Sequence, residues 1–116
     1  MSSRRWRFFV EDILKAIERI QAFVGDTPFE QFARDDLVLA AVERKFITIG
    51  EAVRHIPAHV MDAYPSIPWG QMGDMRNLVA HVYWGVNPRT PWDTIHSDLP
   101  PLIPLMEELL EETEDS

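Results

Sequence analysis

Residues 4–24, RRWRFFVEDILKAIERIQAFV, decide the fold class because their apolar side chains recur every three or four positions. This spacing gathers them on one face of a helix, and Gly25 has the residue type that commonly ends one. The face consists of Trp6, Phe9, Val10, Ile13, Leu14, Ile17, Ile20 and Val24. The stretch therefore predicts a long amphipathic helix.

Two further helices are predicted before residue 57. Thr27, Pro28 and Glu30 have the residue types of an N-cap, a first helical position and a capping-box partner, so a short helix or a turn should begin there. Residues 36–56 then repeat the helical apolar period, and Pro57 should stop or kink the run. We expect a short helix or a turn, followed by a second long helix.

The next part of the chain is rich in turn residues and has no strand pattern. Three prolines and a glycine make residues 57–70 a turn-rich connection, with one short helix over 58–64. Residues 71–85 predict a helix that has Gly73 near its start and Gly85 at its end. This helix holds the residues that are the best candidates for catalysis.

Residues 90–110 predict a last helical stretch. Thr90 and Asp93 repeat the capping pattern, and the apolar period continues to the C-terminal end, although three prolines should bend the helix or split it in two. Helices joined by short connections, with no strand signal and no repeat, indicate an all-α, up-down bundle of four to five helices with short extra helices. We expect one domain over residues 1–116.

Charge and composition limit the classes of partner. The 116 residues carry 19 acidic and 11 basic side chains, and the net charge of −8 disfavours broad coating of a phosphate backbone. Six acidic residues lie within 107–116, either as an ordinary solvated helix end or as a surface for a basic partner. Cysteine is absent, and no apolar run is long enough for a membrane span or a signal-peptide core. We therefore expect a cytoplasmic protein without disulfides.

The segment RNLVAHVY, residues 76–83, places a cation, a base and a phenol close together. Histidine, with an ordinary pKa of about 6.5, can take a proton from a ribose 2′-hydroxyl or return one to the leaving oxygen. Arginine stays charged and can stabilise the charge that builds on a phosphate in the transition state. Arg76 and His81 are therefore candidates for metal-free cleavage of RNA, and Asn77 could orient the ring of His81 or contact the nucleotide.

These side chains do not all share a face on a straight helix. Each residue turns by about 100°, so Arg76 and Tyr83 share one side, Asn77 and His81 share another, and Arg76 and His81 point about 140° apart. They could converge if the helix begins irregularly near Arg76, if the long arginine reaches round, or if a second protomer brings its copy to the same cleft. Arg76 and His81 could also lie five residues apart by chance, and Tyr83 could be an ordinary interfacial aromatic residue.

Other charged residues are weaker candidates. His55 and His59 lie four apart, but Pro57 separates them and no nearby carboxylate or cysteine completes a set, so no metal site is predicted. Arg54 and Arg89 either add positive potential to the cleft or are ordinary solvated side chains.

One acidic and three aromatic residues have two interpretations each. Glu51, in an otherwise apolar helical segment, either pairs with an arginine and shapes the site or is simply exposed. Trp69, Trp84 and Trp92 are predicted to be core and interface anchors rather than platforms on which bases stack.

The motif RNLVAHVY resembles the signature of HepT-like proteins in the HEPN superfamily: an arginine, a polar residue, three residues, a histidine, one residue and a tyrosine. Five segments resemble the family in the same order and at the same spacing: VEDILKAIERI, FITIGEAV, YPSIPWGQMGDMRN, YWGVNP and WDTIHSDLP. The resemblance covers residues 5–110.

This resemblance implies a homodimer in which Arg76 and His81 of both protomers line a shared cleft and cleave RNA without a metal or other cofactor. It further implies a type VII toxin–antitoxin system, in which an MNT-type nucleotidyltransferase antitoxin, alone or in a larger complex with the dimer, transfers AMP from ATP to Tyr83. An anionic adduct there would block the cleft and repel substrate phosphate. The alternative is a non-catalytic helical module that binds a nucleotide or its partner protein, because helical bundles host unrelated functions.

Overall fold

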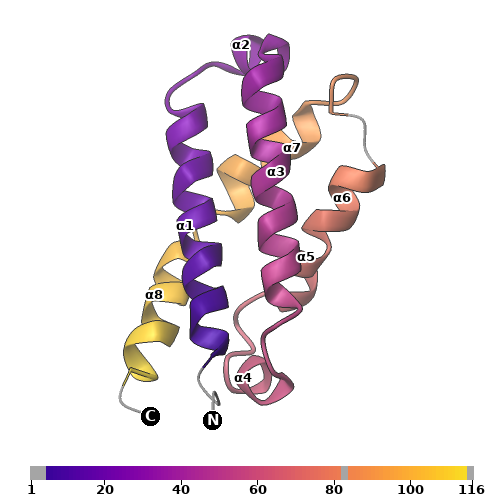
Figure 1. Cartoon of the computed structure of the whole chain (residues 1–116). Coiled ribbons are helices and arrows are strands. Elements are labelled where there is room, and N and C mark those ends of the chain that lie inside the picture. Colours follow the sequence, from indigo (N-terminus) through magenta and orange to yellow (C-terminus); the bar gives the residue numbers. More distant parts are fainter. Residues whose placement is uncertain (1–4, 82–83, 115–116) are drawn as a thin grey trace.

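Successive helical segments run up and down the long axis of the molecule (Figure 1). The computed structural model describes residues 5–81 and 84–114, and every regular element within them is helical. The elements are α1 (Trp6–Val24), α2 (Phe29–Arg34), α3 (Asp36–Val53), α4 (Ala58–Ala63), α5 (Trp69–Gly73), α6 (Met75–His81), α7 (Arg89–Asp93), the π-helical turn η1 (Thr94–Asp98) and α8 (Leu102–Glu112). The predicted all-α, up-down bundle is confirmed.

The antiparallel pair α1 and α3 forms the centre of the bundle. Helix α8 packs on α1, while α5 and α6 pack on the other side of α3 (Figure 1). Ile13 and Ile17 of α1, and Phe46 and Ile49 of α3, are completely buried. Burial of each such side chain contributes about 1.5–3 kcal/mol relative to exposure. The apolar face expected for the first helix is therefore the face that builds the core.

Glycine and aspartate mark the ends of the first long helices. Gly25 ends α1 with a positive φ of 53°, and its N–H donates to the carbonyl of Gln21 at 2.8 Å. The prediction that Thr27 caps the next helix is wrong, because α2 begins at Phe29 and Pro28 precedes it without a side-chain cap. A side-chain cap is found instead at Asp35, whose carboxylate accepts from the N–H of Val38 at 3.1 Å and starts α3.

The helix expected over 71–85 differs in its boundaries. It begins earlier, as α5, and is interrupted at Asp74 before α6 begins at Met75. Its described part ends at His81, and Gly85 lies in a turn over 84–86. The sequence predicted a helix start near Gly73. In the structure this region is instead the junction at Asp74 between two helices, α5 and α6.

The prolines divide the last helical stretch, as expected. Residues 99–101, which include Pro100 and Pro101, separate η1 from α8, whereas Pro104 fits in the first turn of α8, where an N–H has no helical partner. The π-helical turn itself was not predicted. No helix in the described part of the chain is long and apolar enough to cross a membrane.

Candidate active site

Helix α6 carries residues 76–81 of the predicted motif and packs on α3 at a glycine. A β-carbon built on Gly50 would lie 2.8 Å from Cβ of Arg76 and 2.9 Å from its backbone nitrogen. Only glycine allows this close approach of α6 to α3. The approach explains why a glycine lies inside α3, although glycine in a helix interior lowers stability by about 0.5–1 kcal/mol relative to alanine. Gly50 therefore sets the position of the Arg76 backbone against α3. Sequence analysis missed it, although a glycine within a helical apolar run was the available signal.

The side chain of Arg76 extends toward α3. Its Nε lies 2.9 Å from Oε2 of Glu51, and the same oxygen lies 3.4 Å from Nη1 of Arg54. The Arg76 side chain nevertheless remains 52% exposed. Glu51 thus pairs with arginine, as one of its two interpretations predicted, and it holds a guanidinium group that can still meet a ligand from solvent.

The helical break does not bring Arg76 and His81 together. It falls at Asp74 (φ −72°, ψ −10°), so Arg76 and His81 both belong to the same regular helix α6. Their backbone positions consequently keep the separation of about 140° around the axis. Asn77 is exposed and lies one turn before His81. Tyr83 lies outside the described residues.

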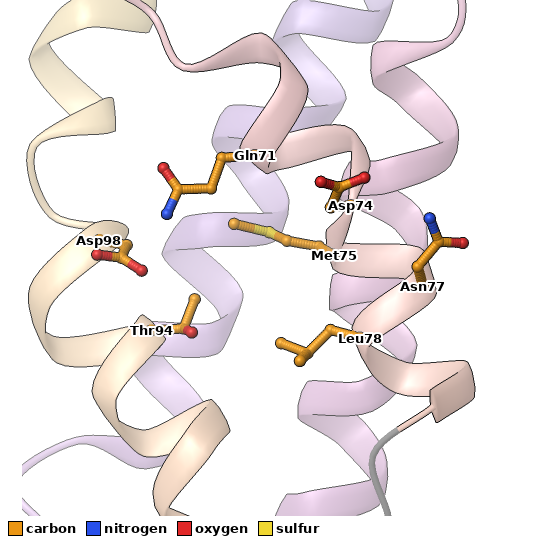
Figure 2. A pocket seen from close by; sticks show the side chains of 7 residues that line it. All are labelled: Gln71, Asp74, Met75, Asn77, Leu78, Thr94 and Asp98. Atoms are coloured by element: carbon orange, nitrogen blue, oxygen red, sulfur yellow. The ribbon is translucent and has the colours of Figure 1, made fainter.

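A pocket opens on the side of α6 that faces η1, and we call it the α6 pocket. It has a volume of about 370 Å³. Its lining comes from α5 through α6 and from η1: Gln71, Asp74, Met75, Asn77, Leu78, Thr94 and Asp98. Figure 2 shows Met75 and Leu78 extending from α6 toward Thr94 and Asp98. Of the predicted site residues, the pocket includes Asn77 but not Arg76.

Three of the remaining candidates, His55, Arg89 and Arg54, have local partners. The ring of His55 stacks on Phe9 with centroids 4.2 Å apart, and the guanidinium carbon of Arg89 lies 3.7 Å from the centroid of Phe29. Arg54 shares Glu51 with Arg76 and is the candidate cation next to the motif.

The tryptophans pack as the sequence predicted. Trp69 and Trp84 are buried, and Trp92 is half-buried in an aromatic cluster with Phe29 and Phe32. Trp84 contacts Phe46 edge to face, with centroids 4.9 Å apart, and its Nε1 has no hydrogen-bond partner among the described residues. All three therefore serve packing.

Tyr64, which does not line the α6 pocket, joins α4 to the acidic end of the chain's last helix. The hydroxyl of Tyr64 donates to Oε1 of Glu112 at 2.7 Å, tying the end of α4 to α8. This hydrogen bond, together with burial and the charges of Glu112 and Glu108, raises the pKa of Tyr64. The acidic end of α8 thus contacts α4, and it also contacts α1, because Nη1 of Arg7 donates to the carbonyl of Leu110 at 3.0 Å and to the hydroxyl of Thr113.

These features define the class of the protein as an all-α, up-down bundle that fixes a half-exposed arginine near the start of α6, whose described part extends to His81. The chain belongs to the HepT-like ribonuclease family. The sequence model described as "Ribonuclease HepT-like" matches residues 13–109.

Relatives in other organisms support the assignment. A protein of Thermococcus cleftensis named "Probable ribonuclease HepT" is 39% identical over 99 residues, which are 85% of this chain and 90% of the relative. A protein of Methanocaldococcus jannaschii named "Putative RNase MJ0127" is 33% identical over 114 residues, 98% of this chain and 94% of the relative. A comparison with solved structures gave no significant match.

Proposed function

We propose that residues 1–116 form one HepT-like domain that cleaves RNA as a metal-independent endoribonuclease and acts as the toxin of a type VII HEPN/MNT toxin–antitoxin system. Family membership supports the reaction class, since the relatives named above are ribonucleases by name. The observation that carries the residue assignment is the half-exposed Arg76, held by Glu51 near the start of α6, the helix that also contains His81.

In the proposed reaction, His81 handles protons and Arg76 handles charge. His81 takes the proton of a ribose 2′-hydroxyl, whose oxygen attacks the adjacent phosphorus. The bond from phosphorus to the 5′-oxygen breaks, that oxygen receives a proton, and a 2′,3′-cyclic phosphate remains. Arg76 stabilises the additional negative charge on the phosphate oxygens as the bond order changes. Asn77 supports the site by orienting His81 or the nucleotide.

A homodimer would resolve the offset between the two catalytic residues. Positions about 140° apart on one helix do not face one substrate atom, whereas two copies of α6 can present Arg76 from one protomer beside His81 from the other. Mixing the variants Arg76→Ala and His81→Ala tests this. Mixed dimers should regain cleavage that neither variant has alone, and formation of mixed dimers without any gain would contradict a shared site.

Cleavage is tested with purified protein and single-stranded or transfer RNA in EDTA. The wild type should produce fragments with cyclic phosphate ends, and His81→Ala should abolish them while the circular dichroism spectrum stays unchanged. His59→Ala, an exposed histidine on α4, is the matched control and should cleave normally. Equal cleavage by the wild type and His81→Ala would favour the non-catalytic binding module.

Regulation is proposed to act at Tyr83. An MNT-type nucleotidyltransferase would join the phenolic oxygen to the α-phosphate of ATP, release pyrophosphate and leave an anionic adduct beside the motif. Incubation with this partner and ATP should add AMP mass that Tyr83→Phe loses. Tyr64 is the other tyrosine of the chain, so Tyr64→Phe should still accept AMP. Adduct formation on Tyr83→Phe would contradict the assignment.

A further inference from the structure

The α6 pocket has an apolar floor and a polar rim. Met75 is buried and Leu78 is half-buried, and both side chains point toward η1 (Figure 2). The side chains of Gln71, Asp74 and Asp98 are exposed and make no hydrogen bond or ion pair with any residue that the structure describes. At about 370 Å³, the volume falls within the range of about 300–1,000 Å³ typical of small-ligand sites. The pocket therefore has the build of a binding site.

The polar groups determine what kind of ligand fits. Ionised carboxylates only accept hydrogen bonds, so Asp74 and Asp98 favour a ligand with N–H groups and repel a phosphate. The hydroxyl of Thr94 donates to the carbonyl of Thr90 at 3.2 Å, which leaves its oxygen as an acceptor too. The amide of Gln71 can donate and accept. A ligand must thus offer several donors, one acceptor and an apolar face.

We propose that the α6 pocket binds an unpaired nucleobase of the RNA substrate and prefers guanine to uracil. The N1–H and amino group of guanine form two adjacent donors that match one carboxylate, whereas uracil presents carbonyl oxygens on both sides of its single N–H. The flat ring would lie against Met75 and Leu78. This inference rests on the proposed ribonuclease function, for which it names the specificity site.

The position of the pocket supports a base rather than a phosphate there. Asn77 lines the pocket and directly follows Arg76, which extends to the other side of α6. The phosphate of a bound nucleotide would therefore approach Arg76, away from the repulsion of the two carboxylates, while its base would enter the pocket. A basic side chain of a protein partner would also pair with the carboxylates, but it has no acceptor for the amide N–H groups of Gln71 and Asn77.

Binding is tested first without any catalysis. Guanosine and uridine are titrated into labelled protein while the methyl resonances of Met75 and Leu78 and the amide resonance of Asp98 are followed by NMR. Guanosine should shift these resonances and uridine should not, and Asp98→Asn should weaken the guanosine effect about tenfold. Asp62→Asn, the same charge change on an exposed residue of α4, should bind like the wild type.

Specificity is then tested with single-stranded RNAs that carry one guanine among uracils. Cleavage should be fastest at a linkage beside the guanine, about tenfold above the same linkage in an all-uracil RNA, and Asp98→Asn should remove this preference while Asp62→Asn retains it. A preference that persists in Asp98→Asn would overturn the proposal.

The two experiments separate the base site from the reaction. Guanosine binding in a protein that cuts no RNA would support the pocket and defeat the ribonuclease proposal. Cleavage without base preference, together with unmoved resonances, would overturn the pocket and leave the ribonuclease proposal intact. Resonances that respond to a lysine- and arginine-rich peptide or to Mg²⁺ but not to guanosine would also overturn the proposal of a nucleobase site, because the pocket would then bind cations.

Discussion

The two sides of α6 are built in opposite ways. Toward α3, the helix is packed so closely that Gly50 has no room for a β-carbon, and Arg76 is paired with Glu51. Toward η1, the helix borders the α6 pocket, whose exposed polar side chains are unpaired among the described residues. The packed side holds a charged group in position, and the open side leaves space for a substrate. One short helix can therefore combine a fixed cation with a selective pocket.

Enlarging Gly50 should disturb the packed side most. Gly50→Ala places a carbon 2.8 Å from Cβ of Arg76, so α6 must move away from α3. We expect the free energy of unfolding to fall by about 1–3 kcal/mol, as for other overpacked sites, and RNA cleavage to fall with it. Urea unfolding and a cleavage assay measure the two effects.

Gly70 provides the matched control for that substitution. It also lies in a helix, α5, but a β-carbon there meets no atom within 4 Å. Gly70→Ala should leave stability unchanged or raise it by up to about 1 kcal/mol, since alanine favours the helix. Equal stability of Gly50→Ala and Gly70→Ala would show that the α3–α6 contact is less tight than described.

Removing the charge of Glu51 should loosen Arg76 without unfolding the protein. The Glu51 and Arg76 side chains are 44% and 52% exposed, so Glu51→Gln should change the free energy of unfolding by less than about 1 kcal/mol. The cleavage rate should fall by more than this small loss of stability explains. The fall should be in kcat rather than KM, because the guanidinium group of Arg76, once released from Glu51, samples unproductive positions. Glu43→Gln on the same helix is the control, and an equal loss of kcat there would rule out a specific role of Glu51.

The smallest expected effect lies at the far end of the bundle. Tyr64 is held by Glu112, and the raised pKa of Tyr64 means that this contact stabilises the fold below the ordinary tyrosine pKa of about 10 and is lost as pH rises through the higher folded value. Tyr64→Phe should therefore lower stability at neutral pH by less than about 1 kcal/mol, a difference that disappears in strong alkali. Thermal unfolding across this pH range measures it, and a difference that grows with pH would contradict the assignment.

Local features of the fold were predictable from sequence, and features made by distant residues were not. The apolar period of residues 4–24 and the split at Pro100 and Pro101 depend on the residues themselves, and both are found. The cap at Asp35 and the break at Asp74 depend on competition between neighbouring signals, which the pattern could not rank.

The same distinction applies to the site. The roles of Arg76 and His81 follow from their side chains and from family resemblance, and they stay predictions. The ion pair with Glu51 joins residues 25 positions apart, and the α6 pocket brings Gln71 of α5 close to Asp98 of η1, with α6 and α7 between them in the sequence. Such pairings depend on how helices pack, and a hydrophobic period gives only the buried face of each helix.

The most direct test of the account is the cleavage rate of Arg76→Ala beside that of Arg54→Ala under single-turnover conditions in EDTA. Both arginines contact the same oxygen of Glu51, so the pair separates a specific role from the loss of one positive charge. We predict that Arg76→Ala slows cleavage by about 100-fold or more, as for loss of one group that stabilises transition-state charge, while Arg54→Ala stays close to the wild type. Equal rates for the two variants would contradict the central role of Arg76.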